Sequence, residues 1–324
     1  MNRRPPPQRQ RGIALITALL VVAIATVLAV EIAARERLDI RRTQNLIARD
    51  QAYDLALAAE AWALDILRTD LEDDNQLDGP QDNWAQPIML PPFEGATLNM
   101  RLEDLQGRFN LNNLVNVPVD PQQAANDLHY KRFRLLLENL AQQHELSVNP
   151  QELIDSLADW LDPDVQARPL GAEDSYYMSL ENPRRTANQL LASPTELLLV
   201  KGYTPELVNL LLPHVTALPE SATSINLNTA TREVLRSLDR RINDSLAERL
   251  EQLRQEKAWE SVELFLQAAE LSPADFQSSG LGVSSQYFAF YGDVSLGPAR
   301  NQLQSLISRS TDGLRVLWRA RGTL

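Results

Sequence analysis

The chain begins with an abrupt change from basic to apolar positions and then keeps a helical pattern. The run Ile13–Val30 carries no charge, and its only polar residues are two threonines. At about 1.5 Å of rise per residue, this run spans about 27 Å, enough to cross the hydrocarbon core of a bilayer. Residues 31–68 contain no Gly or Pro and are rich in Ala, Leu, Glu and Arg. The pattern predicts one helix over 13–72, of which 13–34 spans a membrane.

The second half of this helix carries apolar residues at helical spacing. They recur three or four positions apart, or at a small multiple of this: Tyr53, Leu57, Ala61, Leu64 and Leu71. Apolar positions at this period form one stripe along a helix, and such a stripe needs a partner to cover it. We therefore expect the second half of the helix to pack against a folded domain.

After the helix, the pattern changes from helical to alternating. Residues 73–96 are rich in Asp, Asn, Pro and Gly, which is typical of a loop, and Trp84 gives this loop one large side chain for anchoring. Leu98, Met100 and Leu102 then alternate with polar residues, and a second short apolar stretch, 109–111, follows. The two stretches predict a β-hairpin that is buried on one face.

The end of the chain shows the same alternation. Tyr287, Ala289 and Tyr291 are separated by single residues, and the turn sequence STDG precedes the apolar stretch LRVLWRA. Strands are therefore expected at both ends of the region that follows the helix. Residues 73–117 and 285–324 are assigned to one β-core.

Residues 118–284 have an almost wholly helical pattern. Helices that interrupt a sheet in this way predict an α+β fold, in which the long N-terminal helix packs on an antiparallel sheet and a large all-α domain is inserted between strands. Within this block, "INLNTATREVL" (225–235) is similar to helix-hairpin-helix modules that bind DNA backbones. The hairpin that follows, at 239–241, lacks the glycine of such modules. DNA binding is the less favoured interpretation.

Charge and composition narrow the possible functions. The 324 residues have a net charge of −12 although residues 1–12 contain four arginines, so the remainder is distinctly acidic. An acidic surface repels nucleic acid and attracts cations. Cysteine is absent, and the three histidines, His129, His144 and His214, lie far apart without a catalytic pattern. We predict a protein that is not an enzyme; the alternative is a single-pass envelope enzyme, or a nucleic-acid receptor that uses the helical domain.

The arginines before the apolar run also predict the orientation of the chain. Positive residues favour the cytoplasmic side, so residues 1–12 are expected in the cytoplasm and the bulk of the chain outside it. A secretory signal peptide cleaved near Ala33 and Ala34 is the alternative. It is disfavoured because the helical pattern continues through that point instead of giving way to a turn.

One acidic stretch in the helical block suggests a metal site. Four carboxylates lie within thirteen residues, namely Asp162, Asp164, Glu173 and Asp174. Hard oxygen ligands from an irregular loop suit Ca²⁺, and Asp159 and Asn188 are further candidate ligands. The alternative is a solvated acidic loop balanced by Arg168, Arg184 and Arg185. The spacing alone leaves both interpretations open.

The N-terminal pattern resembles a known processing signal. A short basic leader that ends in Gly12, followed by an apolar helix from Ile13, is similar to the class III signal of type IV pilins and type II secretion pseudopilins. The resemblance implies a cut between Gly12 and Ile13 by a prepilin peptidase, and methylation of Ile13. It also implies a pilin-like core, with the leader and helix anchored in a bacterial inner membrane and the remainder in the periplasm.

One departure from this pattern points to a single branch of the family. Most pilins and pseudopilins have glutamate at the fifth mature position, whereas this chain has Thr17. The long minor pseudopilin K of type II secretion lacks that glutamate and carries a large inserted α-domain. The resemblance implies Ca²⁺ bound near the "GAEDSYY" loop, and minor pseudopilins I and J as partners, with exported proteins as further contacts. It also implies a role in capping the pseudopilus tip and nucleating its assembly.

Overall fold

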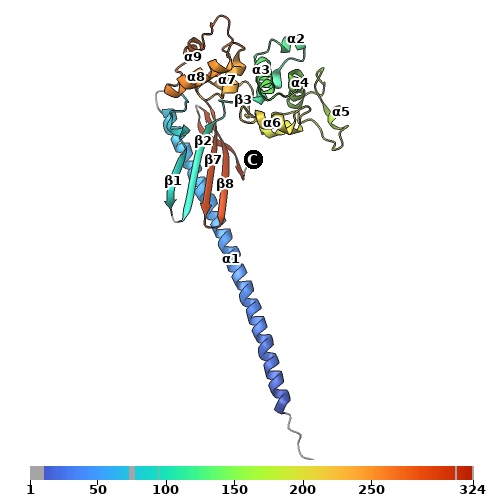
Figure 1. The fold of residues 1–324 in the computed structure, drawn as a ribbon, viewed down its shortest axis with the longest axis vertical. Coiled ribbons are helices and arrows are strands. Elements are labelled where there is room, and N and C mark those ends of the chain that lie inside the picture. Colours follow the sequence, from blue (N-terminus) through green and yellow to red (C-terminus); the bar gives the residue numbers. More distant parts are fainter. Residues whose placement is uncertain (1–10, 73–76, 94, 311, 323–324) are drawn as a thin grey trace, which may run out of the picture.

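A computed structural model describes residues 11–72, 77–93, 95–310 and 312–322. It contains a long helix, a five-stranded sheet and a domain of short helices (Figure 1). The helices and 3₁₀ turns are α1 (Arg11–Glu72), η1 (Asn83–Ala85), η2 (Leu111–Asn116), α2 (Pro121–Ala124), α3 (Leu128–Gln143), α4 (Pro150–Leu161), α5 (Asp174–Tyr177), η3 (Pro194–Leu199), α6 (Pro205–Leu211), α7 (Arg232–Leu238), α8 (Asp244–Glu256) and α9 (Val262–Ala268). The strands are β1 (Ile88–Phe93), β2 (Ala96–Asp104), β3 (Phe109–Asn110), β4 (Val215–Thr216), β5 (Ile225–Asn226), β6 (Leu281–Gly282), β7 (Tyr287–Leu296), β8 (Ala299–Ser310) and β9 (Gly313–Arg321).

The main sheet is antiparallel, with strand order β1-β2-β7-β8-β9. The helical domain leaves the sheet after β2 and returns at β7, and these two strands are neighbours, with Asp104 opposite Phe288. The predicted α+β fold, with helices inserted between strands, is therefore confirmed. The predicted strands on both sides of the STDG turn are also confirmed, since β8 and β9 pair from Ser310 and Gly313.

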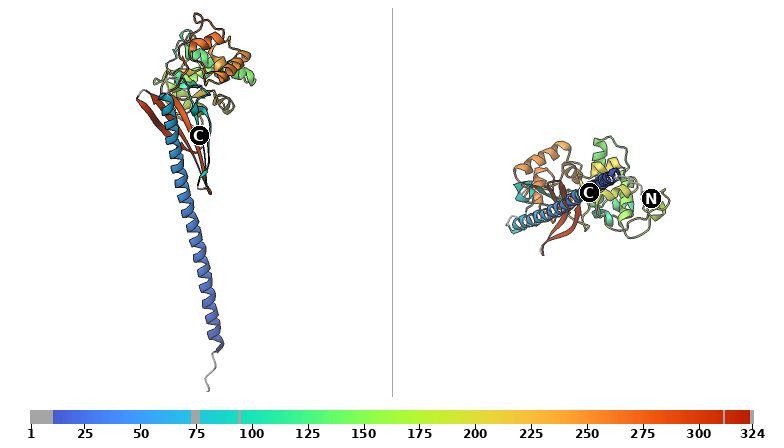
Figure 2. Two further views of the ribbon diagram at one scale, coloured as in Figure 1. Left: turned by 90° about the vertical axis from the view of Figure 1, so that its left-hand side faces the viewer. Right: turned by 90° about the horizontal axis from the view of Figure 1, so that it is seen from below.

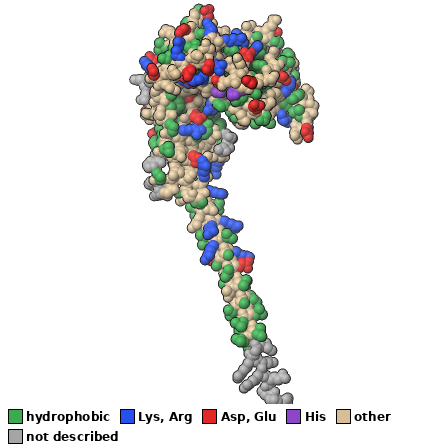
Figure 3. Space-filling model, viewed as in Figure 1, with side chains coloured by type: hydrophobic (Ala, Val, Ile, Leu, Met, Phe, Trp, Pro, Cys, Tyr) green, Lys and Arg blue, Asp and Glu red, His purple; other side chains and the backbone are tan. Residues whose placement is uncertain are grey.

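Helix α1 has two halves with different surroundings (Figures 1 and 2). From Ala14 to Leu46 its side chains are exposed, and this part holds the one candidate membrane span found among the described residues. Hydrophobic side chains cover its lower end, and charged ones follow above (Figure 3). The C-terminal half lies against the sheet, where Ala52, Ala56 and Ala63 are fully buried. The single long helix predicted over 13–72 is thus present as one continuous element.

The buried stripe of α1 differs from the predicted one. The side chains that face the sheet are mostly smaller, and all but the last are shifted by one or two positions: Ala52, Ala56, Ala59, Ala63 and Leu67. Of the predicted stripe, Tyr53, Leu57 and Leu64 are half buried at its border, whereas Ala61 and Leu71 are exposed. Alanine lets the helix backbone approach the sheet closely, so the smallest apolar residues occupy the centre of the contact.

The expected hairpin between 98–102 and 109–111 was also wrong. Strand β2 pairs with β1 and β7, whereas Phe109 and Asn110 form a short parallel bridge with β4 of the helical domain. Phe109, Leu111, Leu114 and Val117 pack in the same apolar cluster as the helices. The helical domain therefore takes in residues that the sequence assigned to the β-core, and its packing begins before residue 118.

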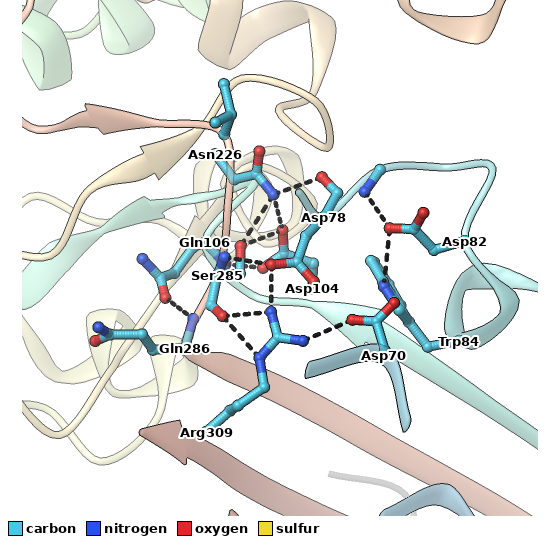
Figure 4. Close-up of polar contacts among 12 residues, drawn as sticks. Asp70, Asp78, Asp82, Trp84, Asp104, Gln106, Asn226, Ser285, Gln286 and Arg309 are labelled. Carbon is cyan, nitrogen blue, oxygen red and sulfur yellow. Dashed lines mark hydrogen bonds and ion pairs between the residues drawn. The ribbon is translucent and has the colours of Figure 1, made fainter. Parts of the chain in front are cut away.

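A buried polar network joins the sheet to the helical domain (Figure 4). We call Asp70, Asp78, Asp104, Asn226, Ser285 and Arg309 the junction network. The Arg309 guanidinium donates to Asp78 and, at 2.7 Å, to Asp70. The Asn226 amide donates to the Asp78 carbonyl oxygen at 3.0 Å, to Asp104 Oδ2 at 2.9 Å and to Ser285 Oγ at 3.0 Å. Because Asn226 belongs to β5 of the helical domain, these bonds fix that domain on the sheet.

Candidate calcium site and similarity to known proteins

The predicted metal loop begins where α4 ends. The Asn149 side chain caps the start of α4 by accepting from the Gln151 amide at 3.2 Å. Leu157 and Trp160 anchor the last turns of the helix in the apolar cluster of the domain. Asp162 is the residue that follows the last helical turn, so its position is fixed by a well-packed element. The acidic loop therefore starts from a rigid base, and its carboxylates are held by the fold.

The structure brings three of the four predicted carboxylates together. Asp162, Asp164 and Glu173 each offer an oxygen, and these three oxygens lie within 4.8 Å of one another. Asp162 and Glu173 are buried, whereas Asp164 is exposed. Asp174 does not belong to this group: its carboxylate accepts from Thr186 N and Thr186 Oγ1, each at 2.9 Å, and the same hydroxyl lies 3.2 Å from Glu173 Oε2. We call Asp162, Asp164 and Glu173 the loop cluster; Asp174 is outside it.

Several buried oxygens at the loop cluster lack a hydrogen-bond donor among the described residues. These are Asp162 Oδ1, Glu173 Oε1 and Asn188 Oδ1. The amide nitrogen of Asn188 donates to the Asp164 carbonyl oxygen at 2.9 Å, which holds this side chain beside the loop. A buried oxygen without a donor is costly unless a cation coordinates it. Three such hard oxygens fit Ca²⁺, which takes six to eight oxygen ligands in flexible geometry.

The loop cluster carries more negative than positive charge. Arg168 is its buried cation: its guanidinium lies 3.2 Å from Asp162 Oδ2 and 3.6 Å from Asp159 Oδ1. Burial raises the pKa of Asp162 and of Glu173, and the other carboxylates of the cluster raise it further. Of the three carboxylates of the loop cluster, only Asp162 has an ion pair with Arg168 among the described residues. A bound cation would reverse this electrostatic cost by favouring the ionised forms.

The other charged residues of the stretch have separate roles. Asp159 is fully buried beneath the loop, where it accepts from the Arg168 backbone amide at 3.1 Å, and burial raises its pKa to about 7. Arg184 donates to the Leu199 carbonyl oxygen at 2.8 Å, and Arg185 lies 3.9 Å from Asp174. Two of the three arginines thus lie beside carboxylates of the acidic stretch, Arg168 beside Asp162 and Arg185 beside Asp174, whereas Arg184 bonds the main chain elsewhere.

Sequence reasoning missed the role of Gly171. A Cβ atom at this position would lie 1.9 Å from Asp159 Oδ2 and 3.1 Å from the Asp155 carbonyl oxygen. Only glycine lets the loop cross this close to α4, and this crossing returns the chain to Glu173. The glycine of the GAED sequence was a visible signal, but the partner that requires it is twelve residues earlier and becomes apparent only in three dimensions.

The predicted processing site lies at the start of α1. Gly12 and Ile13 belong to the first turn of the helix, which begins at Arg11, and residues 1–10 of the expected leader lie outside the described residues. The hydroxyl of Thr17 donates to the Ala14 carbonyl oxygen at 3.0 Å. This position thus carries a neutral side chain bonded within its own helix, where most relatives of the resembled family carry a charge.

Comparison with known proteins agrees with these observations. Family models described as "Type II secretion system (T2SS), protein K" match residues 107–220 and 225–284. Type II secretion system protein K of Aeromonas hydrophila is 33% identical over 97% of this chain and 98% of its own length, and that of Pseudomonas aeruginosa is 36% identical over 97% and 93%. This family is a structural, minor pseudopilin component of the secretion system.

A solved structure gives the same result at the level of the fold. The crystal structure of the GspK-GspI-GspJ complex from the type 2 secretion system of enterotoxigenic Escherichia coli contains a chain that is 28% identical, with a TM-score of 0.72. The match covers 87% of the present chain and 100% of that chain. Sequence, helical insertion and overall fold agree, and the chain belongs to the protein K family of the type II secretion system.

Proposed function

We propose that this minor pseudopilin caps the tip of the pseudopilus and nucleates its assembly for the export of folded proteins. The observation that carries the proposal is the position of the helical domain. It lies beyond the sheet at the end of the molecule opposite the exposed half of α1, and it extends sideways over the sheet (Figures 1 and 2). A head stacked above this subunit would need the same space, so the fibre would end here.

Thr17 supports the same position. In a pilin-like fibre, a glutamate at this place would attract the terminal ammonium of the subunit above, and a charge in lipid needs such a partner. A threonine brings no charge, and its hydroxyl is bonded to the Ala14 carbonyl oxygen of its own helix. A subunit at the outermost position has no neighbour above it and therefore no need of that attraction.

The proposal includes the processing and the membrane placement of the chain. A prepilin peptidase would cut between Gly12 and Ile13 and methylate Ile13, and the apolar part of α1 would hold the subunit in the bacterial inner membrane. The leader would lie in the cytoplasm and the sheet and helical domain in the periplasm. Mass spectrometry of the mature chain tests this part, since cleavage near Ala34 or an intact leader would contradict it.

The partners follow from the related complex. The solved E. coli assembly contains GspK, GspI and GspJ, which supports minor pseudopilins I and J as partners of this chain. From Ala14 to Val30 the exposed half of α1 offers uncharged, mostly apolar side chains around the helix, a surface suited to assembly through this helix. Ca²⁺ at the loop cluster, held by Asp162, Asp164, Glu173 and Asn188, would fix the loop between α4 and α5. Its role would be structural.

Immunogold labelling of overproduced pseudopili tests the tip position. An epitope placed in the exposed turn at Gly297, between β7 and β8, lies outside both α1 and the helical domain. We expect gold at one end of each fibre, whereas gold along the shaft would contradict the cap.

A matched variant joins Asp104 to Tyr287 by a short turn, which is possible because β2 and β7 are neighbouring strands. Without its helical domain, this variant should enter the shaft.

A further inference from the structure

A pocket of about 660 Å³ opens in the helical domain, away from the loop cluster and from the junction network. Its walls come from α3, from the turn between α7 and α8, and from the segment 274–277. No residue of the loop cluster or of the junction network lines it. Helices α3, α7 and α8 lie at the end of the molecule farthest from the N-terminal half of α1 (Figure 1). A pocket of this size is typical of a site for a small ligand or a short peptide segment.

The wall of the pocket contains a buried arginine that has no carboxylate partner in the described part of the chain. Arg132 is 1% exposed, and its guanidinium donates to main-chain oxygens, of Gln277 at 3.0 Å and of Gly280 at 3.4 Å. Its Nε is buried and has no acceptor among the described residues. Burial lowers the pKa of Arg132 to about 10. Buried charges are normally paired, so this cation is a place where an anion would be stabilising.

The rim adds further positive charge. Lys131 lines the pocket and has no ion pair within the described part of the chain. Arg134 and Arg240 share the carboxylate of Glu138, at 2.7 and 3.0 Å. The chain as a whole has a net charge of −12, so a local excess of cations stands out against its surroundings.

The remaining walls limit what kind of anion fits. Two carboxylates line the pocket: Asp239 is held by Arg241 at 2.8 Å, and Asp275 also faces Arg241. The apolar side chains of Leu128, Leu238 and Phe276 complete the surface. A fully hydrated anion would make no apolar contact with these side chains. A ligand that combines carboxylates with apolar groups would cover them and also supply counter-charges for Arg132 and Lys131.

We propose that this pocket binds an acidic, partly apolar peptide segment of a partner protein, with a carboxylate directed at Lys131 and Arg132. Such a segment would bring counter-charge to Lys131 and to the buried guanidinium of Arg132, and charge complementarity selects acidic over neutral sequences. Binding in this pocket requires neither the fibre position nor the Ca²⁺ site, and it can be measured on the single chain.

Fluorescence anisotropy with the full-length chain in detergent tests the proposal. The probe is a fluorescein-labelled peptide of glutamate, phenylalanine and serine, and its counterpart carries glutamine in place of each glutamate. We expect the acidic peptide to bind about tenfold more tightly than the neutral one, and binding to weaken as NaCl is raised. Lys131→Glu should weaken binding about tenfold without disturbing the fold, because this side chain makes no ion pair with any residue that the structure describes.

Lys257→Glu is the matched control, since it makes the same charge change at a side chain that is 77% exposed and does not line the pocket. It should leave the affinity unchanged. Arg132→Met should abolish binding, but it also removes the bonds to Gln277 and Gly280, so Lys131→Glu decides the matter. Equal binding of the acidic and neutral peptides, equal effects of the two lysine variants, no binding at all, or displacement by inorganic phosphate at matched ionic strength would each overturn the proposal.

Discussion

The junction network and the loop cluster each bury carboxylates, but the two clusters differ in how the negative charge is compensated. In the junction network, Asp104 Oδ2 accepts from Asn226, Ser285 and Thr229, its Oδ1 accepts from the Gln106 amide, and Arg309 supplies a buried cation. In the loop cluster, Asp162 Oδ1 and Glu173 Oε1 have no donor among the described residues. The carboxylates of the junction network are thus compensated largely by donors of the chain itself. The loop cluster keeps buried oxygens that no described donor bonds.

This difference separates a structural acid cluster from a candidate metal site. The number of carboxylates does not distinguish them, because each cluster has three. The distinction is whether the buried oxygens have protein donors. Asp78 Oδ1 is also unpaired, but it is a single such atom, whereas the loop cluster and Asn188 contribute three. Several buried oxygens without donors, beside carboxylates that lie close together, are therefore the stronger sign of a cation.

Removing the internal cation should have the largest effect. Arg309→Met leaves Asp78 and Asp70 without the guanidinium that bonds both, and we expect a loss of about 3–5 kcal/mol in the free energy of unfolding. The loss should be the same with calcium and with chelator, because this cluster needs no metal. Urea unfolding of the full chain measures it. A loss confined to calcium-free conditions would show that the two clusters are coupled.

The junction network should also make stability depend on pH. Burial, the largest cause, raises the pKa of Asp78 from 3.8 to about 6, against the opposing effect of Arg309. The folded state therefore holds this proton at pH values where the unfolded chain has lost it. The contribution is fully present below about pH 3.8 and is lost as the pH rises through 6, by at most about 3 kcal/mol.

Other carboxylates titrate in the same range, so the comparison with a variant isolates Asp78. Asp78→Asn cannot take up this proton, and its stability should fall less than that of the unchanged chain between pH 4 and pH 7. Urea midpoints at several pH values give both curves. Parallel curves would mean that Asp78 does not titrate in this interval.

Calcium should stabilise only through the loop cluster. A ligand that binds the folded state alone contributes about 2.7 kcal/mol at one hundred times its dissociation constant. Calcium should thus raise the thermal midpoint of the full chain in detergent, and Glu173→Gln or Asp164→Ala should abolish the rise. Asp174→Asn is the matched control: it should keep the response, because that carboxylate is outside the group of three, and the amide oxygen of asparagine can still accept from Thr186. A calcium response equal in Glu173→Gln and the unchanged chain would exclude the site.

The sequence predicted the elements that depend on local pattern. The long helix, the strands on both sides of the STDG turn and the helical insertion all follow from periodicity within short windows. The hairpin between 98–102 and 109–111 failed because strand pairing depends on distant partners, and β2 lies beside β7, almost two hundred residues later. The predicted stripe of α1 was misplaced because Leu57 and Leu64 lie at the border of the contact and not at its centre. Large residues suggested burial where alanines make the close contact.

In the two polar clusters, too, the sequence pattern did not reveal contacts that depend on side-chain direction or on distant segments. The spacing in the acidic loop identified Asp162, Asp164 and Glu173, but side-chain direction separated Asp174 from them. Asn226 was read as part of a segment similar to a DNA-binding hairpin. Its amide instead bonds Asp104, 122 positions earlier, and this role could not be inferred from neighbouring residues. Buried polar networks join distant segments, so they leave little local signal.

The continuity of α1 gives the molecule a mechanical property. Between Ile13 and Glu72 there is no Gly or Pro at which the helix could bend, and its 62 residues form a rod about 93 Å long. The upper end of this rod is fastened to the sheet by close alanine packing and by the buried Glu60, which bonds Arg319 at 2.6 Å. The junction network in turn fixes the helical domain to the sheet. A push on the membrane end would therefore reach the far end of the molecule as a displacement of nearly equal size, as in a piston.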